Sequence, residues 1–299
     1  MSARVLTVRD GGDVWAAISM VVSAVPILAV GTMFPPLGGA IIAVVTAVVY
    51  FTVVAFDGRI APALQGCAVG VGTVALLAVC LYIGSGPLTA VLLLGNAAVF
   101  LELSRQVRSR LVYGSGLALL AAGVLAYSIT VPLDALIDSS LAIRELGVAA
   151  LIASTAFAVA AVLAVCATRS LSMVSKESTG VLMAVSGGAV LYAATAAAVT
   201  VGVWISPDRT GFVAGHTCAT ILWMLTATGV IIFGLNNQAY RKAAVGSGLV
   251  LAGAALVKLF FFDLATLSGM FRVAAFLVAG LLLLFAASYF GRRMRVDES

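Results

Sequence analysis

The chain has 299 residues, of which 63% are hydrophobic and only 10% are charged, and its mean hydropathy is +1.18. A soluble domain carries about 25% charged residues, so this composition excludes a soluble globular fold, whose surface would expose contiguous apolar areas to water. The net charge of +5 comes from short basic clusters between long apolar runs, and not from one basic face, which excludes a nucleic-acid-binding protein.

Ten apolar runs follow one another along the chain, most of them long enough for a membrane-spanning helix. Such a helix needs roughly 20 residues, because a rise of about 1.5 Å per residue must cover about 30 Å of hydrocarbon. The runs are continuous and do not alternate every second residue, which favours helices over barrel strands. They cover residues 14–31, 37–56, 62–84, 88–103, 111–131, 146–168, 179–205, 212–235, 243–263 and 271–291. The sequence therefore predicts an all-α fold, a polytopic transmembrane helix bundle.

The placement of basic residues predicts the orientation of this bundle. If the N-terminus is cytoplasmic, the inner segments carry 13 of the 17 Lys and Arg residues. The outer loops hold Arg144 and Arg209 beside four acidic residues, Asp134, Asp138, Glu145 and Asp208. This positive-inside pattern requires all ten spans and predicts that both termini are cytoplasmic. The first run starts like a signal peptide but lacks a clear cleavage site, so we interpret it as an uncleaved span.

The connections between runs are short, so consecutive helices are expected to pack as hairpins within a single transmembrane domain, 1–299. The longest outer loop, 132–144, mixes apolar and acidic residues and is predicted to lie as an amphipathic piece on the outer surface.

An internal repeat is visible in the sequence. Residues 110–117 align with residues 242–249, which follow 132 residues later, and both stretches place Gly-Ser-Gly-Leu after a basic turn. The alignment predicts a parallel repeat of 88–168 and 220–293; chance similarity among Gly-rich helices is the alternative. The glycines of the returning helices are predicted to allow close helix packing, with gate hinges as the alternative.

The charged residues near the last hairpin are the strongest site candidates. Lys258 lies about 24 Å along its helix from Lys242 at the usual rise, still inside the hydrocarbon. An ionised group at this depth is normally paired, cavity-facing or snorkelling. Asp263 and Arg272 stand at the outer helix ends and could lock the hairpin across its turn. The three charges are interpreted either as structural anchors or as a binding site for an anionic substrate or headgroup.

Residues for catalysis are scarce in the rest of the chain. No acid lies in the middle of a span, and no phosphate-cradling loop with Lys and Ser/Thr occurs. His216 is the only histidine and is interpreted as an interfacial packing residue. Glu102 and Arg105 are predicted to form a surface pair, and the outer pair Asp134 and Asp138 is weak evidence for catalysis. We therefore predict no catalytic, cofactor-binding or metal site.

The four cysteines support the same conclusion. Cys67, Cys80, Cys166 and Cys218 all lie in apolar runs, and none has a CxxC or Cys/His metal spacing. They are predicted to be small, buried apolar residues without disulfides.

The last quarter of the chain carries a recognisable pattern, Lys-x-x-x-x-Asp-Leu from Lys258 followed by Gly-x-x-Arg from Gly269. Residues that accompany it are Trp223, Gly234, Arg241, Gly248, Leu249, Phe276, Gly280, Ser288, Tyr289, Arg292 and Arg293. In these positions 223–293 resembles the bacterial multi-pass membrane-protein family called domain of unknown function 2339. The resemblance implies a membrane protein, in which Lys258, Asp263 and Arg272 belong together, and implies no activity. Family members are commonly longer, so this chain would be a short or divergent relative.

Two functions are compatible with these observations. The first is a non-enzymatic scaffold of the bacterial cytoplasmic membrane, without cofactors, that binds membrane lipids and other membrane proteins. The second is a transporter or flippase for an amphipathic or anionic solute, with Lys258 and Arg272 as its outer binding charges. The scarcity of catalytic groups favours the first.

Overall fold

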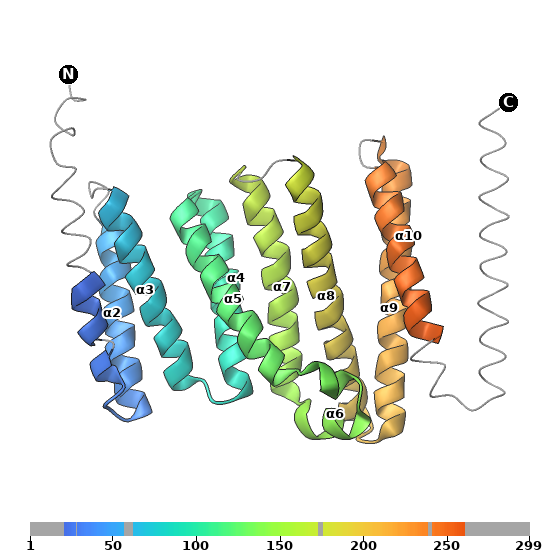
Figure 1. The fold of residues 1–299 in the computed structure, drawn as a ribbon, viewed down its shortest axis with the longest axis horizontal. Coiled ribbons are helices and arrows are strands. Elements are labelled where there is room, and N and C mark those ends of the chain that lie inside the picture. The colour runs from blue at the N-terminus through green and yellow to red at the C-terminus, as the bar shows by residue number, and fades with distance from the viewer. Residues whose placement is uncertain (1–20, 28, 57–61, 173–175, 239–240, 261–299) are drawn as a thin grey trace. The chain divides into compact units, whose positions relative to one another are not determined.

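The structure of the chain is a computed structural model that describes residues 21–27, 29–56, 62–172, 176–238 and 241–260. Within these ranges the backbone forms helices and no strand (Figure 1). The predicted all-α fold is therefore confirmed for the described part of the chain.

The helices follow the predicted runs closely. Residues 21–27 and 29–31 are helical, and the elements after them are α2 (Pro36–Phe56), α3 (Pro62–Ile83), α4 (Pro87–Val107), α5 (Arg110–Thr130), the 3-10 helix η1 (Leu133–Leu136), α6 (Ser139–Glu145), α7 (Val148–Ser170), α8 (Lys176–Ile205), α9 (Arg209–Asn236) and α10 (Arg241–Lys258). Each predicted run as far as 243–263 overlaps one helical segment, whereas 271–291 lies outside the described residues.

The ends of the helices are marked by residues that suit them. Pro36, Pro62 and Pro87 are the first residues of α2, α3 and α4, where a missing N–H costs no helical hydrogen bond. The side chain of Ser109 caps α5 and accepts a hydrogen bond from the Val112 N–H. These local signals explain why the apolar runs are divided where they are.

The predicted end of α4 was wrong by about one turn. The apolar run stops at residue 103, but the helix continues through Arg105 and Gln106 to Val107. The next residue, Arg108, adopts the left-handed conformation, with φ of 53°, and ends the helix. A polar turn at the membrane surface can form helical backbone hydrogen bonds as well as an apolar turn can. Hydropathy alone therefore places the end of α4 too early.

Six described helices are long and apolar enough to cross a membrane by length and composition. They are Leu64–Ile83, Pro87–Val107, Arg110–Thr130, Val148–Ser170, Gly180–Ile205 and Arg209–Asn236. Large apolar side chains point away from the protein on these helices and on α2; Leu37 is 74% exposed and Ile129 is 81% exposed. Water would solvate such a surface poorly, whereas lipid tails would solvate it well.

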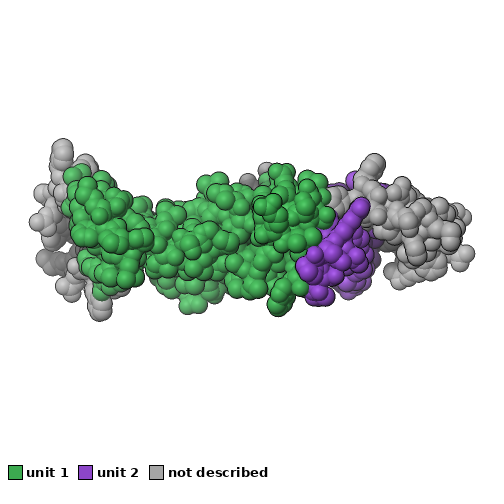
Figure 2. Space-filling view, turned by 90° about the horizontal axis from the view of Figure 1, so that it is seen from below, with its two compact units in different colours: residues 1–204 green, residues 205–299 purple. Residues whose placement is uncertain are grey.

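The chain divides into two compact units, residues 1–204 and residues 205–299 (Figure 2). In the first unit α2 packs on α3, and α4 packs on both α5 and α7. In the second unit α9 packs on α10. Consecutive helices thus form the predicted hairpins α2–α3, α4–α5 and α9–α10. No observation tests whether the whole chain is one domain, so that stays a prediction.

Hydroxyl groups connect the helices of the first unit. Tyr113 on α5 bonds Thr168 on α7 at 2.6 Å between their oxygens, and Tyr127 bonds Ser154 on the same pair of helices at 2.7 Å. Thr73 on α3 donates to Ser115 on α5 at 2.8 Å. In lipid there is little hydrophobic drive between helices, so such bonds and close packing of small residues hold them together.

Two aligned glycines of the predicted repeat lie at close approaches in their own hairpins. A Cβ on Gly116 of α5 would lie 2.9 Å from Leu101 Cγ of α4, and a Cβ on Gly248 of α10 would lie 2.5 Å from Ile231 Cγ1 of α9. The packing role is confirmed for these two positions. It is not supported for Gly114 and Gly246, whose Cβ would meet no described atom within 4 Å. The repeat itself stays a prediction.

The loop predicted to be amphipathic folds into η1 and α6. Leu136 and Ala142 are buried, whereas Leu133 and Ile137 are 66% and 65% exposed. Because the exposed side chains of Leu133 and Ile137 are apolar as well, this pattern does not separate an apolar from a polar face, and the amphipathic character stays a prediction. Its contact with the outer membrane surface stays a prediction.

Candidate functional site

Lys258, the predicted intramembrane cation, lies in the last turn of α10 and reaches across to α9. Its ammonium Nζ donates to the backbone carbonyl oxygen of His216 at 3.0 Å and to the hydroxyl oxygen of Thr220 at 2.5 Å. The Thr220 hydroxyl in turn donates to the same carbonyl at 3.0 Å. We call this closed group of an ammonium, a hydroxyl and a carbonyl the Lys258 triangle.

The sequence of α9 explains why these acceptors face α10. His216 and Thr220 are four residues apart, which places them on one side of a helix, and each is 4% exposed. A threonine at this spacing donates its hydroxyl proton back to the carbonyl one turn earlier, which leaves the lone pairs of its oxygen for the ammonium. A carbonyl oxygen also has two lone pairs and can accept the ammonium in addition. Helix α9 therefore presents a ready acceptor pair.

The Lys258 triangle offsets part of the cost of burying a charge. Lys258 is half-buried, and an ammonium in hydrocarbon is costly unless it is paired or solvated. Two of its three donors go to oxygens of α9, and hydrogen bonds with an ionised donor are roughly twice as strong as neutral ones. Chemically, this arrangement binds one helix to another.

Asp263 and Arg272, the other two predicted site residues, lie outside the described residues. Their pairing across the last turn, and their association with Lys258, therefore stay predictions.

His216 packs against an aromatic ring of its own helix. Its ring lies 4.6 Å from the ring of Phe212, one turn earlier on α9, at an interplanar angle of 60°. Both residues are 4% exposed. The ring contact and the burial support a packing role for His216, whereas its position at the membrane interface stays a prediction.

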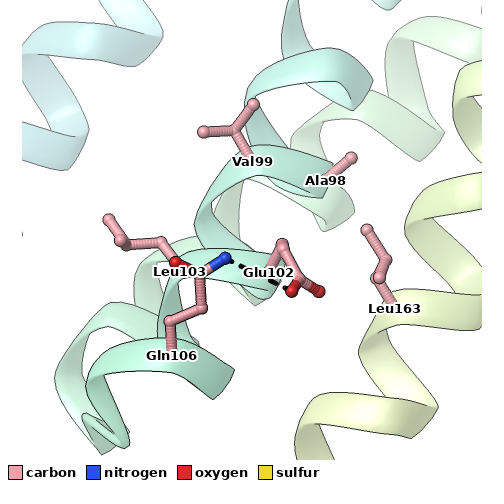
Figure 3. Close-up of a pocket in the computed structure, with 6 residues that line it drawn as sticks. All are labelled: Ala98, Val99, Glu102, Leu103, Gln106 and Leu163. Atoms are coloured by element: carbon pink, nitrogen blue, oxygen red, sulfur yellow. Dashed lines mark hydrogen bonds between the residues drawn. The ribbon is translucent and has the colours of Figure 1, made fainter.

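The predicted pair of Glu102 and Arg105 is also confirmed. Their side chains are 40% and 37% exposed and form an ion pair of 2.6 Å. Gln106 donates to the other Glu102 oxygen at 3.5 Å. A shallow cavity of about 400 Å³ lies beside this pair, and Leu163 of α7 faces Glu102 across it (Figure 3). Because the carboxylate is already matched by a guanidinium, this place suits a surface contact better than catalysis.

The acidic residues of the loop between α5 and α7 have structural roles. Asp138 caps α6, and its carboxylate accepts hydrogen bonds from the Ser140 hydroxyl and the Ser140 backbone N–H, both at 2.8 Å. The Ser140 side chain, followed by its N–H, lowers the pKa of Asp138. A carboxylate occupied in this way is a poor proton acceptor, which argues against a catalytic pair with Asp134.

A larger groove opens at the same end of the first unit. It has a volume of about 700 Å³ and is lined by α3, the start of α4 and the last turns of α5. Its wall is mainly apolar and includes Leu77, Leu81, Leu93, Ala122, Leu125 and Ile129. Among the described residues that line it, Glu145 of α6 alone is charged. We call it the Glu145 groove.

The cysteines and metal-ligating residues form no cluster in the described ranges. There, no group of three or more His, Cys, Asp or Glu side chains is placed to hold a metal ion. All four cysteines are free, so the prediction of no disulfide is confirmed. The predicted burial is correct for Cys80, but Cys67 and Cys166 are half-buried and Cys218 is exposed. An apolar run shows that a residue lies in the membrane, not which side of the helix it occupies.

Two parts of these sites were missed in the sequence. The first is Thr220, although its spacing of four residues from His216 is a signal for a shared acceptor face. The second is the Glu145 groove, for which the sequence contains no signal, because the groove depends on the angles between α3, α4 and α5.

The comparison with known families confirms the resemblance and extends it. Residues 152–294 match the family model described as "Predicted membrane protein (DUF2339)". The resemblance therefore covers roughly the second half of the chain, and its predicted restriction to the last quarter was too narrow. No curated protein and no solved structure matches the chain. With its six long apolar helices, the chain is a multi-pass integral membrane protein.

Proposed function

We propose that this multi-pass membrane protein, whose second half matches a family of predicted membrane proteins, is a non-enzymatic scaffold of the bacterial cytoplasmic membrane. It spans the bilayer ten times with both termini in the cytoplasm, and it binds membrane lipids and other membrane proteins. It uses no cofactor and does not bind nucleic acid.

The observation that carries this proposal is the use of Lys258. A carrier for an anionic solute needs an accessible cation in the membrane. Here two donors of the ammonium are directed at the neighbouring helix, to His216 at 3.0 Å and to Thr220 at 2.5 Å. A cation that binds two helices together serves stability.

The contacts within the first unit support the same conclusion. Its helices are joined by hydroxyl pairs, such as Tyr127 with Ser154, and by close approach at small residues. Two acidic residues described there have local partners: Glu102 pairs with Arg105, and Asp138 caps a helix. These features join the helices of the bundle and leave few described polar groups for chemistry.

A carrier for an amphipathic solute is the second candidate, and the Glu145 groove is the observation that favours it. The groove is apolar and large enough for a ligand. Its lining includes Glu145 and no described basic residue, so it does not use the cation that an anionic solute would require.

A double-mutant cycle on the Lys258 triangle distinguishes these functions. Lys258→Met and Thr220→Val are made singly and together in the full chain, and the free energy of unfolding in detergent is measured with increasing denaturing detergent. The scaffold proposal predicts that each single variant has a lower free energy of unfolding than the unmodified protein. It also predicts a coupling energy of about 1 kcal/mol between the two changes. Thr217→Val is the matched control, because the Thr217 hydroxyl is exposed and bonds the Val213 carbonyl of its own helix; it should not couple to Lys258→Met.

If Lys258 is instead the binding cation of a carrier, the same cycle should give the opposite result. Binding residues are commonly kept at the expense of stability, so Lys258→Met would then be as stable as the unmodified protein or more stable. That outcome, with no coupling to Thr220→Val, would overturn the scaffold.

A further inference from the structure

We infer that the Glu145 groove binds one phospholipid with a primary ammonium headgroup, a phosphatidylethanolamine, with an acyl chain in the groove and the ammonium on Glu145. The inference rests on the proposed function only for the orientation, which places this end of the first unit at the outer leaflet.

The apolar part of the groove has the depth that a lipid tail requires. On α5 the lining runs from Ala122 to Thr130, which is about 12 Å at the usual helical rise, most of the roughly 15 Å that one leaflet contributes to the hydrocarbon core. The volume of about 700 Å³ is in the range of sites that bury much of a ligand. The groove therefore suits a chain that enters along the helices.

The groove is also open to the membrane at its rim. Leu81 of α3 is 58% exposed, and Leu125 and Ile129 of α5 are 69% and 81% exposed. Since these side chains lie on spanning helices, they face lipid and not water. A lipid can therefore enter from the side, without crossing the headgroup region.

The headgroup is identified by the charge at the mouth of the groove. Glu145 is the last residue of α6 and is exposed, and a carboxylate there repels an anionic headgroup. A primary ammonium has three N–H donors for carboxylate oxygens, whereas the quaternary ammonium of a choline headgroup has none. Charge and hydrogen bonding together favour phosphatidylethanolamine over phosphatidylglycerol and phosphatidylcholine.

The inference is tested by counting the lipids that stay bound. The full chain is purified from nanodiscs of equal parts dioleoyl phosphatidylethanolamine, phosphatidylcholine and phosphatidylglycerol, and the retained lipids are counted by native mass spectrometry. We expect phosphatidylethanolamine to exceed phosphatidylcholine by about fivefold, the effect of one charge-assisted hydrogen bond at an exposed site. Glu145→Gln should abolish this preference, because an amide keeps the shape and loses the charge.

Two further variants locate the site. Asp134→Asn is the matched control, because Asp134 is an exposed carboxylate of the same loop outside the groove lining; it should leave the preference unchanged. Ala122→Phe fills the groove and should lower the retention of all three lipids. If that variant does not fold, Ile129→Trp at the exposed rim replaces it.

Equal retention of the three lipids by the unmodified chain, a preference for phosphatidylglycerol, or an unchanged preference in Glu145→Gln would each overturn the inference. So would normal retention in the groove-filling variant. Lipid counts report on the groove alone, and the coupling of Lys258 to Thr220 reports on the scaffold alone, so either proposal can fail while the other stands.

Discussion

The glycines of α5 provide a sharp test of how the helices of this membrane protein pack. Gly114 and Gly116 are two residues apart on one helix, but only the second touches α4. A Cβ on Gly116 would lie 2.9 Å from Leu101 Cγ and 3.1 Å from the Leu101 backbone nitrogen. Because one of these atoms belongs to the backbone, a rotamer change of Leu101 relieves only part of the crowding, and the two helices must also shift slightly apart.

The magnitude follows from two opposing effects. Replacing glycine by alanine in a helix stabilises it by up to about 1 kcal/mol, and this gain applies to both positions. Overpacking a tight contact costs about 1–3 kcal/mol, and this cost applies to Gly116 alone. We therefore expect Gly114→Ala to be neutral or stabilising, and Gly116→Ala to be less stable than Gly114→Ala by about 1–3 kcal/mol.

The assay is unfolding of each variant in detergent under increasing denaturing detergent, with helicity as the readout. The comparison of two alanine variants cancels the propensity of alanine itself. If the two variants agree within about 0.5 kcal/mol, the close contact of α4 and α5 at Gly116 is refuted.

Three further predictions concern other parts of the chain. Tyr127→Phe should destabilise the protein by about 0.6 kcal/mol, measured in the same assay, because it removes the 2.7 Å bond to Ser154; no change would show that this bond contributes nothing. The pKa of Asp208 is lowered mainly because its carboxylate accepts a hydrogen bond of 2.9 Å from the Gly211 N–H. The ionised Asp208 therefore stabilises the fold at a pH above its unfolded pKa, and this stabilisation is lost as the pH falls through its folded pKa. Melting curves below pH about 4 should show a fall in melting temperature that is smaller in Asp208→Asn. Asp263→Ala and Arg272→Ala should each lower the amount of folded protein, measured by detergent size exclusion; normal amounts and heat stability of both would contradict the hairpin lock.

Much of the fold could be predicted from the sequence because lipid imposes a simple rule. Backbone groups in hydrocarbon must be satisfied within the segment, so a continuous apolar run becomes a helix, as α7 and α9 show. The prediction was less accurate where the rule does not apply. The last turn of α4 is polar and still helical, and the loop 132–144 contains two short helical pieces, so hydropathy alone could not give their bounds.

The candidate sites were predictable only in part. The depth of Lys258 follows from counting residues along α10, which identified it as a cation within the hydrocarbon. Its partners depend on how α9 is rotated about its axis, and no hydropathy pattern fixes that rotation in lipid, where both sides of a helix are apolar. The Glu145 groove depends on the angle between helices, which local sequence does not encode.

The orientation of the chain in the membrane underlies both the scaffold and the lipid site, and cysteine labelling tests it most directly. In a variant with the four native cysteines replaced by alanine, single cysteines are placed at Gln106 and at Ser140, both exposed. A membrane-impermeant maleimide should label position 140 in intact cells, and position 106 only after the membrane is opened. Labelling of position 106 from outside, or protection of position 140, would contradict the account.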